Sequence, residues 1–256
     1  KYIISFFLKT IPRKQLQLIS HYVLKILSLF YMGNQVECPV CLRQFRKFLP
    51  YGRIGRPNAL CPHCLSLERH RLLWLFLKDK TEFFTISAKM LHIAPELCYI
   101  KRFESLPKLD YLTADIESPL AKIKMDIHDI PFPENTFDVI FCNHVLEHVQ
   151  DDKKALSEML RVLKPGGWAI LQIPIFKPLI DQTIEDPTLK DPKKRAELFG
   201  QDDHVRMYGK DYADRIRSTG FDVIEEHFIT ELAPSLVKKH ALPEGEIIHR
   251  AIKPNQ

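Results

Sequence analysis

Hydrophobic residues in the second half of the chain occur in short runs that alternate with segments of helical periodicity. The apolar runs span residues 90–94, 111–115, 139–142 and 169–174. Residues 151–163 instead carry apolar side chains at helical spacing, and the sequence Lys164-Pro165-Gly166-Gly167 ends that segment. Strands that alternate with helices are typical of a parallel sheet covered by helices. The pattern therefore predicts an α/β fold over residues 81–256, with final strands at 221–228 and 246–252.

The front of the chain follows a different pattern, with apolar residues at helical spacing over residues 1–34. Polar residues such as His21 and Lys25 interrupt this stretch, so no uncharged run reaches the length of about 20 residues that spans a bilayer. We predict an amphipathic helical segment that packs on the main domain. A second interpretation is that residues 1–32 lie on a membrane surface as a basic helix.

Two Cys-x-x-Cys pairs, Cys38-Pro-Val-Cys41 and Cys61-Pro-His-Cys64, are separated by 19 residues. This spacing is typical of a structural zinc site, in which four thiolates close a tetrahedron around the ion. Two disulfides or four buried thiols are the alternatives, and the proline inside each pair argues against both. We therefore predict a zinc-binding module and a linking helix over residues 35–80. Reduced cysteines at a metal site indicate a reducing compartment, and hence a cytoplasmic protein.

Charge is distributed unevenly along the 256 residues, whose formal net charge is +5. Residues 1–80 contain 14 Lys and Arg against 3 Asp and Glu, whereas residues 81–256 contain 23 against 29. A basic front on an acidic remainder indicates an anionic partner, such as nucleic acid, lipid head groups or a phosphorylated substrate. Alternatively, the basic side chains solvate the surface or balance the thiolates.

Polar residues follow several of the predicted strands, where an open parallel sheet binds its ligands. Asp115 ends a strand 21 residues beyond Ala94, and Asp126 follows a short segment at residues 122–125. An ionised carboxylate at this separation accepts hydrogen bonds from both hydroxyls of a nucleotide ribose. Asp126 is placed to accept from an adenine amine, and the backbone N–H of Ile127 to donate to the ring. The alternatives are that Asp115 caps a helix and that Asp126 begins a turn.

Five motifs in this part of the chain resemble the class I S-adenosylmethionine-dependent methyltransferases. They are L-H-I-A-P-E (91–96), T-A-D-I (113–116), D-I-H-D-I-P-F (126–132), F-D-V-I-F-C-N-H-V-L-E-H-V (137–149) and L-R-V-L-K-P-G-G (160–167). The resemblance implies a Rossmann-like, seven-stranded, mostly parallel sheet that follows the N-terminal helical segment and the zinc module. It also implies S-adenosylmethionine as the cofactor, bound by residues within or beside these motifs: His92, Ala94, Glu96, Asp115, Ile116, Asp126, Ile127, Asn143 and His144.

Residues 174–208 interrupt the rhythm of strands and helices and form a predicted insertion. The candidate catalytic bases are three histidines after the fourth strand and in this insertion: His144, His148 and His204. Asp203 is placed to orient an imidazole, and Arg206 and Tyr208 to position an anionic acceptor. The alternative is a capped loop that carries a surface ion pair.

The sequence thus predicts an enzyme that methylates a small-molecule, lipid- or sugar-linked acceptor, with the zinc module helping to form the acceptor site. Two alternatives remain. In the first, the chain methylates RNA and its basic zinc module binds the phosphates. In the second, the protein is a non-catalytic scaffold with a degenerate cofactor site. The first loop favours this last alternative, because it contains Ala94 and Pro95 where the family normally has glycines.

Overall fold

Two compact units make up the chain in the computed structural model, which describes residues 24–52, 55–176 and 178–255. Unit one comes from three segments of the chain: Lys1–Phe84, Glu96–Ser105 and Phe228–Glu246. Unit two comes from the other three: Thr85–Pro95, Leu106–His227 and Ile247–Gln256. Most of the amphipathic segment expected over residues 1–34 lies outside the described residues. The predicted division into 1–34, 35–80 and 81–256 stays a prediction.

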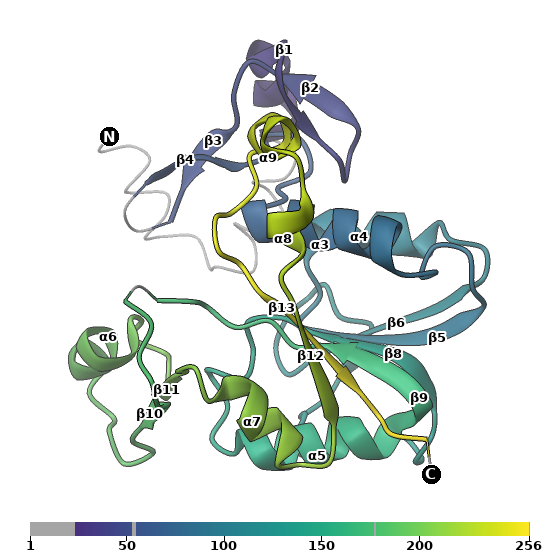
Figure 1. The fold of residues 1–256 in the computed structure, drawn as a ribbon, viewed down its shortest axis with the longest axis vertical. Helices are drawn as coiled ribbons and strands as arrows, with labels where there is room; N and C mark the ends of the chain where they lie inside the picture. Colours follow the sequence, from purple (N-terminus) through teal and green to yellow (C-terminus); the bar gives the residue numbers. More distant parts are fainter. Residues whose placement is uncertain (1–23, 53–54, 177, 256) are drawn as a thin grey trace. The chain divides into compact units, whose positions relative to one another are not determined.

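A seven-stranded sheet forms the centre of unit two (Figure 1). Its strands are β5 (Ala88–Ile93), β6 (Leu109–Asp115), β7 (Ile123–Lys124), β8 (Phe137–Cys142), β9 (Leu163–Ile170), β12 (Asp222–Glu226) and β13 (Ile248–Ile252). Their order across the sheet is β12-β13-β9-β8-β5-β6-β7, and β13 runs antiparallel to both of its neighbours. The other pairs in the sheet are parallel. The expected Rossmann-like, seven-stranded, mostly parallel sheet is therefore confirmed.

The central strands β5 and β8 are buried along almost their whole length. They therefore appear in the sequence as continuous apolar runs rather than as alternating ones. Helix α5 (Asp152–Val162) contributes a buried stripe to the same core, including Leu156 and Met159. Asp151 begins this helix, because its carboxylate accepts a hydrogen bond of 2.9 Å from the backbone N–H of Lys154.

The strand after α5 differs from the prediction in its bounds. β9 begins at Leu163 and ends at Ile170, so the Pro165-Gly166-Gly167 sequence lies inside the strand rather than in a separate turn. The pairing with β8 shifts in register between Phe137 and Val139, because extra residues of β9 bulge out there. Gly166 has φ +74°, a conformation that glycine adopts without steric cost.

The predicted insertion contains three short elements: β10 (Ile184–Glu185), α6 (Pro192–Phe199) and β11 (Arg206–Met207). β10 and β11 form an antiparallel pair in which Glu185 lies opposite Arg206. Asp191 begins α6 by accepting backbone hydrogen bonds, and Gly200 ends it in the left-handed conformation. The insertion is followed by α7 (Tyr212–Arg217), which contacts α5. The break in the alternation of strands and helices thus corresponds to a small folded insertion.

Unit one combines short antiparallel hairpins with four α-helices among the described residues (Figure 1). The elements are a 3₁₀-helix at Ser28–Tyr31, β1 (Met32–Cys38), β2 (Arg43–Phe45), β3 (Leu49–Tyr51), β4 (Arg56–Leu60), α3 (Glu68–Lys80), α4 (Leu97–Glu104), α8 (Phe228–Glu231) and α9 (Pro234–His240). β1 pairs with β2, and β3 pairs with β4. No helix among the described residues is both long and apolar enough to cross a membrane.

The side chain of Arg71 organises unit one from within. It is fully buried, and its guanidinium lies 4.3 Å from the ring centroid of Phe48. The guanidinium donates hydrogen bonds to five backbone carbonyls, those of Asn58, Ala59, Ser66, His240 and Ala241. Three of these carbonyls flank the second cysteine pair and two end α9. A single cation therefore connects the cysteine module to a helix near the end of the chain.

A buried histidine on β13 makes the stability of unit two depend on pH. Burial lowers the pKa of His249 to about 4, and the positive charges of His227 and Arg217 add to this effect. Because the unfolded chain binds this proton below about pH 6.5 and the folded chain does not, the free energy of unfolding falls between about pH 6.5 and 4. Above this range the contribution is fully present.

We expect the loss across this window to be about 3 kcal/mol and to vanish in His249→Gln. Urea unfolding between pH 4 and 7, followed by the fluorescence of Trp168 in a Trp74→Phe background, measures it. His227→Gln removes only a secondary cause of the lowered pKa and should keep most of the slope, because burial of His249 is the main cause. An equal slope in His249→Gln and the parent protein would show that another group titrates.

Candidate functional site

Two carboxylates lie at the edge of the sheet where the parallel strands β6 and β7 end. Asp115 is the last residue of β6 and pairs with Lys124 of β7, and Asp126 follows two residues later. The backbone carbonyl of Asp115 also accepts a hydrogen bond of 3.0 Å from the N–H of Met125. This pairing brings the two predicted adenosine-binding positions to the same edge.

Each carboxylate also closes a local turn. Asp115 Oδ1 accepts hydrogen bonds from the backbone N–H groups of Glu117 at 2.7 Å and Ser118 at 2.6 Å. Asp126 Oδ1 accepts from the N–H of His128 at 2.9 Å, and the ring Nδ1 of His128 lies 2.7 Å from the same oxygen. The backbone donor and then the imidazole of His128 lower the pKa of Asp126. Asp126 therefore begins a turn, which was the alternative given for it. Asp115 also closes a turn, whereas the alternative given for it was a helix cap.

The loop after β5 makes a sharp turn without a glycine. Ala94 has φ +50°, and its N–H donates to the carbonyl of Ala114 at 2.9 Å. That left-handed conformation is one that glycine normally occupies, so alanine accepts here the strain that the family's glycine avoids. The chain thus makes a tight turn after β5 without a glycine.

The other predicted cofactor residues near these loops lie in different surroundings. His92 is buried in β5, where its Nδ1 is 2.7 Å from the hydroxyl of Tyr111. Ile127 packs into the core of unit two, whereas Ile116 is exposed. Glu96 belongs to unit one, where its carboxylate lies 3.8 Å from His70 Nε2.

The segment after β8 carries the remaining predicted residues. Asn143 is buried, and His144 adopts φ +55° while its N–H donates to the carbonyl of Gln172 at 2.7 Å. The ring of His144 points Nδ1 at the carboxylate of Glu147, with 3.4 Å between Nδ1 and Oε1. A histidine held in this way has one nitrogen oriented by a carboxylate, as in many acid–base sites.

Glu147, His148 and His204 form a tight cluster, which we call the Glu147 cluster. Each residue offers one ligand atom, and these atoms lie within 4.8 Å of one another. The rings of His148 and His204 meet edge to face, with 4.7 Å between centroids. Glu147 and His204 are buried, whereas 36% of the His148 side chain is exposed. The structure thus brings together two of the three predicted catalytic histidines.

Glu147 had no chemical role in the sequence prediction, although it is the centre of this cluster. Burial alone raises the pKa of the Glu147 carboxyl, but the contact with His144 and the charges of His144 and His148 reverse this, so the pKa is lowered. Burial lowers the pKa of His204. The cluster therefore combines an ionised carboxylate with a neutral imidazole near neutral pH.

Arg206 holds the two segments of the cluster together. Its buried guanidinium donates to the backbone carbonyls of Leu146 and Val149 at 2.6 Å and of Gln150 at 2.9 Å. In addition, the N–H of Val205 donates to the carbonyl of Glu147 at 2.9 Å. The loop after β8 and the end of the insertion are therefore joined on both sides of the cluster.

The contacts of Arg206 and Tyr208 do not support their expected role, which was to position an anionic acceptor. The guanidinium N–H groups of Arg206 are used within the protein, and its Nε lies 3.1 Å from Glu185. The hydroxyl of Tyr208 donates to Asp152 at 2.7 Å. Neither residue forms the surface ion pair of the alternative, because both side chains are buried. Their role is to position the residues before and after the cluster.

A cavity of about 270 Å³ lies beside this network in unit two, lined among others by Asp152, Glu185, Val205, Arg206 and Arg215. Three of its charged side chains are already paired, since Arg215 contacts Asp152 at 2.6 Å and Glu185 at 2.8 Å. None of the predicted cofactor residues lines it. The cavity therefore belongs to the ion-pair network that supports the cluster.

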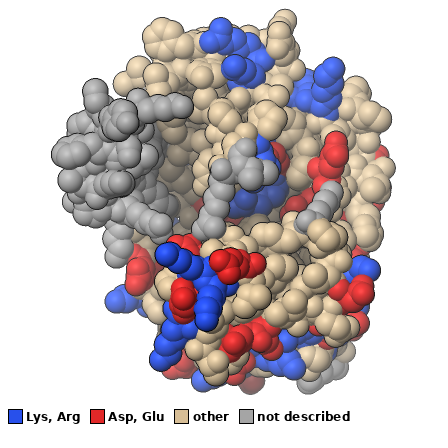
Figure 2. All heavy atoms as spheres, turned by 90° about the vertical axis from the view of Figure 1, so that its left-hand side faces the viewer, with Lys and Arg blue, Asp and Glu red and all other residues tan. Residues whose placement is uncertain are grey.

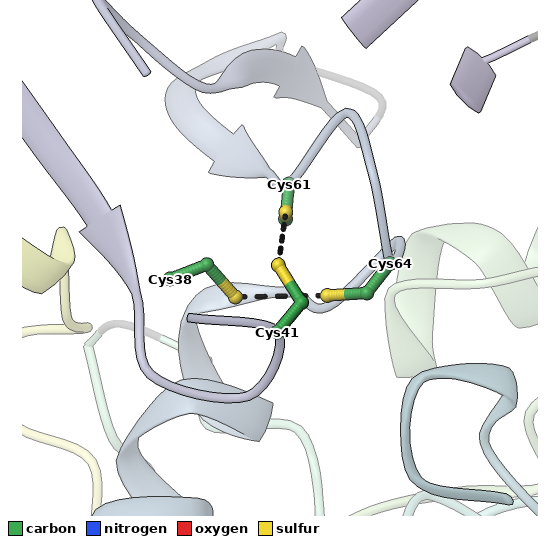
Figure 3. Close-up of side chains that lie close together, drawn as sticks. All are labelled: Cys38, Cys41, Cys61 and Cys64. Atoms are coloured by element: carbon green, nitrogen blue, oxygen red, sulfur yellow. Dashed lines mark hydrogen bonds between the residues drawn. The ribbon is translucent and has the colours of Figure 1, made fainter. Parts of the chain in front are cut away.

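The four predicted metal-ligating cysteines converge in unit one (Figure 3). Cys38 Sγ lies 3.6 Å from Cys64 Sγ, and Cys41 Sγ lies 3.8 Å from Cys61 Sγ. These distances exclude sulfur–sulfur bonds, which are about 2.05 Å long, and all six cysteines are free thiols. The disulfide alternative is thus removed.

Residues 84–171 match the family model described as "Methyltransferase domain". The matched region contains β5 to β9 and all of the predicted cofactor residues, but neither the four predicted metal-ligating cysteines nor His204. Residues 84–171, about a third of the chain, are thus similar to a methyltransferase domain.

Among curated proteins, the ubiquinone/menaquinone biosynthesis C-methyltransferase UbiE of Pasteurella multocida is 42% identical over 59 residues, which is 23% of this chain and 22% of that protein. An uncharacterized methyltransferase of Schizosaccharomyces pombe, C1B3.06c, is 52% identical over 42 residues, 16% of this chain and 15% of that protein. The chain thus spans less than a quarter of the length of these relatives.

Solved structures with a similar arrangement include the YcgJ protein of Bacillus subtilis, at 14% identity and a TM-score of 0.47 over 73% of this chain and 100% of that one. Another is phosphoethanolamine N-methyltransferase 2 of Haemonchus contortus in complex with S-adenosyl-L-methionine. It has 17% identity and a TM-score of 0.45 over 72% of this chain and 52% of that one.

Replacing Arg206 by methionine tests whether this side chain supports the cluster. Arg206→Met leaves three backbone carbonyls without their charged donor, and we expect the free energy of unfolding to fall by about 3 kcal/mol or more. Arg217→Met is the matched control, because that guanidinium is 43% exposed and pairs with Asp214 at the surface. Denaturant unfolding followed by Trp168 measures both. Equal, small losses in the two variants would contradict the supporting role.

Proposed function

We propose that this protein is an S-adenosylmethionine-dependent methyltransferase. The observation that carries the proposal is the match of residues 84–171 to a methyltransferase domain, whose acids Asp115 and Asp126 follow neighbouring parallel strands. Ligands of open parallel sheets bind beyond this edge. The seven-stranded, mostly parallel sheet is the one that the resemblance implied.

We assign the cofactor to the loops that end β5 to β8. The turn at Asp115 uses Oδ1, so Oδ2 remains for the ribose hydroxyls. Asp126 and the N–H of Ile127 are the proposed partners of the adenine ring, and Asn143 lies nearer the methionine end. Burial of the Ile127 side chain fixes the backbone that carries its N–H. When bound, the cofactor supplies a methyl group on a positively charged sulfur.

His144 is the proposed proton acceptor among the three histidine candidates. Its Nδ1 faces the buried Glu147 carboxylate, which orients the ring and stabilises its protonated form. It also directly follows β8, beside Asn143, where the acceptor meets the methyl group in this assignment. A hydroxyl acceptor loses a proton on methylation and benefits from such a base. His148 and His204 adjoin it through the Glu147 cluster.

A small-molecule, lipid- or sugar-linked acceptor suits the described surface better than RNA. In unit one, Arg71 is buried, Arg56 pairs with Glu68 and Lys80 pairs with Glu231, so these cations serve the fold. Figure 2 shows basic side chains interspersed with acidic ones on the face of unit two that it displays. An RNA-binding surface gathers its basic residues instead. The proposed acceptor is therefore a compact one.

Cofactor binding tests this function, with S-adenosylhomocysteine as the titrant in calorimetry. Asp115→Asn keeps an Oδ1 acceptor for the turn but removes the charge, so we expect Kd to rise at least about 10-fold, which is about 1.4 kcal/mol. Asp110→Asn, at a 69% exposed position of the same strand, should bind normally. An absence of heat with the unaltered protein would favour the non-catalytic scaffold, and equal binding by Asp115→Asn would refute the assignment of the ribose.

We also propose that the four cysteines bind a structural Zn²⁺. Tetrahedral Zn–S bonds of about 2.3 Å separate the sulfurs by about 3.8 Å, close to the distances found here. Burial and the neighbouring sulfurs raise the pKa of Cys61, so the thiols resist ionising together without a cation. A divalent ion removes this conflict, because it binds the deprotonated sulfurs.

Cys38→Ser should therefore abolish stoichiometric zinc and destabilise unit one. We expect about one Zn²⁺ per chain in the purified protein by emission spectrometry, and a lower unfolding temperature in the variant by Trp74 fluorescence. Cys98→Ser is the control, since Cys98 is a buried thiol of the same unit outside the cysteine group. Zinc-free purified protein, or undiminished zinc in Cys38→Ser, would contradict the assignment.

A further inference from the structure

The Glu147 cluster contains two buried polar atoms that no described group satisfies. Glu147 Oε2 and His204 Nε2 are both enclosed without a hydrogen-bond partner in the described part of the chain. Their residues are 1% and 0% exposed. Leaving such an atom unpaired costs about 1–3 kcal/mol. Two of them in one cluster therefore indicate a ligand that both atoms bind.

The hydrogen bonds of the two histidines show which nitrogens are available to that ligand. His204 Nδ1 lies 2.9 Å from the carbonyl oxygen of Phe199. A carbonyl only accepts, so Nδ1 carries the proton and Nε2 carries the lone pair. The same holds for His148, whose Nδ1 lies 3.4 Å from the carbonyl oxygen of Asp203. Its Nε2 is 4.0 Å from Glu147 Oε1.

A carbonyl or carboxylate behind the imidazole is the usual setting of a metal-ligating histidine, because it fixes the tautomer and directs the other nitrogen to the ion. Asp203 supplies both groups to His148, since its carboxylate lies 3.6 Å from Nδ1. The two oxygens of the Glu147 carboxylate have different surroundings. Oε1 faces His144, and Oε2 has no hydrogen-bond partner among the described residues and is available to a ligand.

We propose that Glu147, His148 and His204 bind a divalent transition-metal cation. Two imidazoles and a carboxylate suit Zn²⁺ and its neighbours in the first transition row, whereas Ca²⁺ and Mg²⁺ prefer oxygen ligands alone. Three protein ligands leave a coordination position open, in contrast to four thiolates. The exposed side of His148 gives that position access to solvent. It therefore takes a water or an oxygen of a small ligand.

This site goes beyond the proposed methyltransferase activity and does not require it. One consequence does rest on that activity: a hydroxyl bound at the open position has a lowered pKa, so the site favours an oxygen acceptor beside His144. Arg206 preorganises the ligands, because it joins the loop of Glu147 and His148 to the strand after His204.

Calorimetric titration of the full chain with Zn²⁺, after one equivalent has been added for the cysteines, tests the site. We expect a second ion per chain, bound at least about 10-fold more weakly by both Glu147→Gln and His148→Ala. His128→Gln is the matched control and should bind it normally. His128 forms another histidine–carboxylate pair of unit two, at 2.7 Å from Asp126, but without a third ligand.

Zinc uptake that is the same in Glu147→Gln, His148→Ala and the unaltered protein would overturn the proposal. The partly exposed His148 keeps the test decisive if the buried Glu147 variant fails to fold, which circular dichroism would detect. The result is separate from the cofactor experiment. A chain that binds Zn²⁺ through this cluster and ignores S-adenosylhomocysteine would keep the metal site and lose the methyltransferase.

Discussion

The candidate site depends on one buried cation, Arg206. Its guanidinium satisfies three carbonyls of a loop that follows β8, and that loop has no regular hydrogen-bonded structure of its own at these positions. A buried charge is tolerated only where its donors are used. The same hydrogen bonds therefore offset the desolvation free energy of the buried Arg206 guanidinium and determine the conformation of the loop. Glu147 and His148 are positioned as a result.

The sheet and the insertion contribute different residues to the candidate site. The parallel strands carry Asp115, Asp126 and Asn143 to one edge, since each lies at or just after the end of its strand. The insertion, which is not part of the matched methyltransferase region, brings His204 to the loop after β8. The Glu147 cluster thus combines two residues of the matched region, Glu147 and His148, with one residue outside it, His204.

Most of the sheet could be predicted from the sequence, because buried parallel strands appear as uninterrupted apolar runs and the family motifs implied seven strands. The cysteine group was equally readable, since short-range spacing alone brings the two sulfurs of each pair together. Asp115 and Asp126 were located for the same reason: strand ends are visible in the pattern. Their second role in local turns was also among the alternatives.

The remaining features depend on contacts between distant residues. Arg206 was expected to position an anionic acceptor, and nothing local shows that its guanidinium is buried against three backbone carbonyls. Glu147 had no predicted chemical role, and its partner His204 is 57 residues away. Glu96 lies next to the expected cofactor loop in sequence yet groups with unit one, because α4 packs there. The one available signal was the density of ionisable residues in His144-Val-Leu-Glu147-His148.

Arg71 has a consequence for the order in which the chain becomes structured during synthesis. Two of its five acceptors, the carbonyls of His240 and Ala241, lie 169 and 170 residues after Arg71 and are therefore synthesised much later than the other three. Domains generally fold from the N-terminus as translation proceeds. Here the guanidinium of Arg71 lacks two of its five protein acceptors until α9 emerges. The hydrogen bonds of the cysteine module are therefore completed late. The cysteine module, which is synthesised early, is thereby completed by α9, which is synthesised much later.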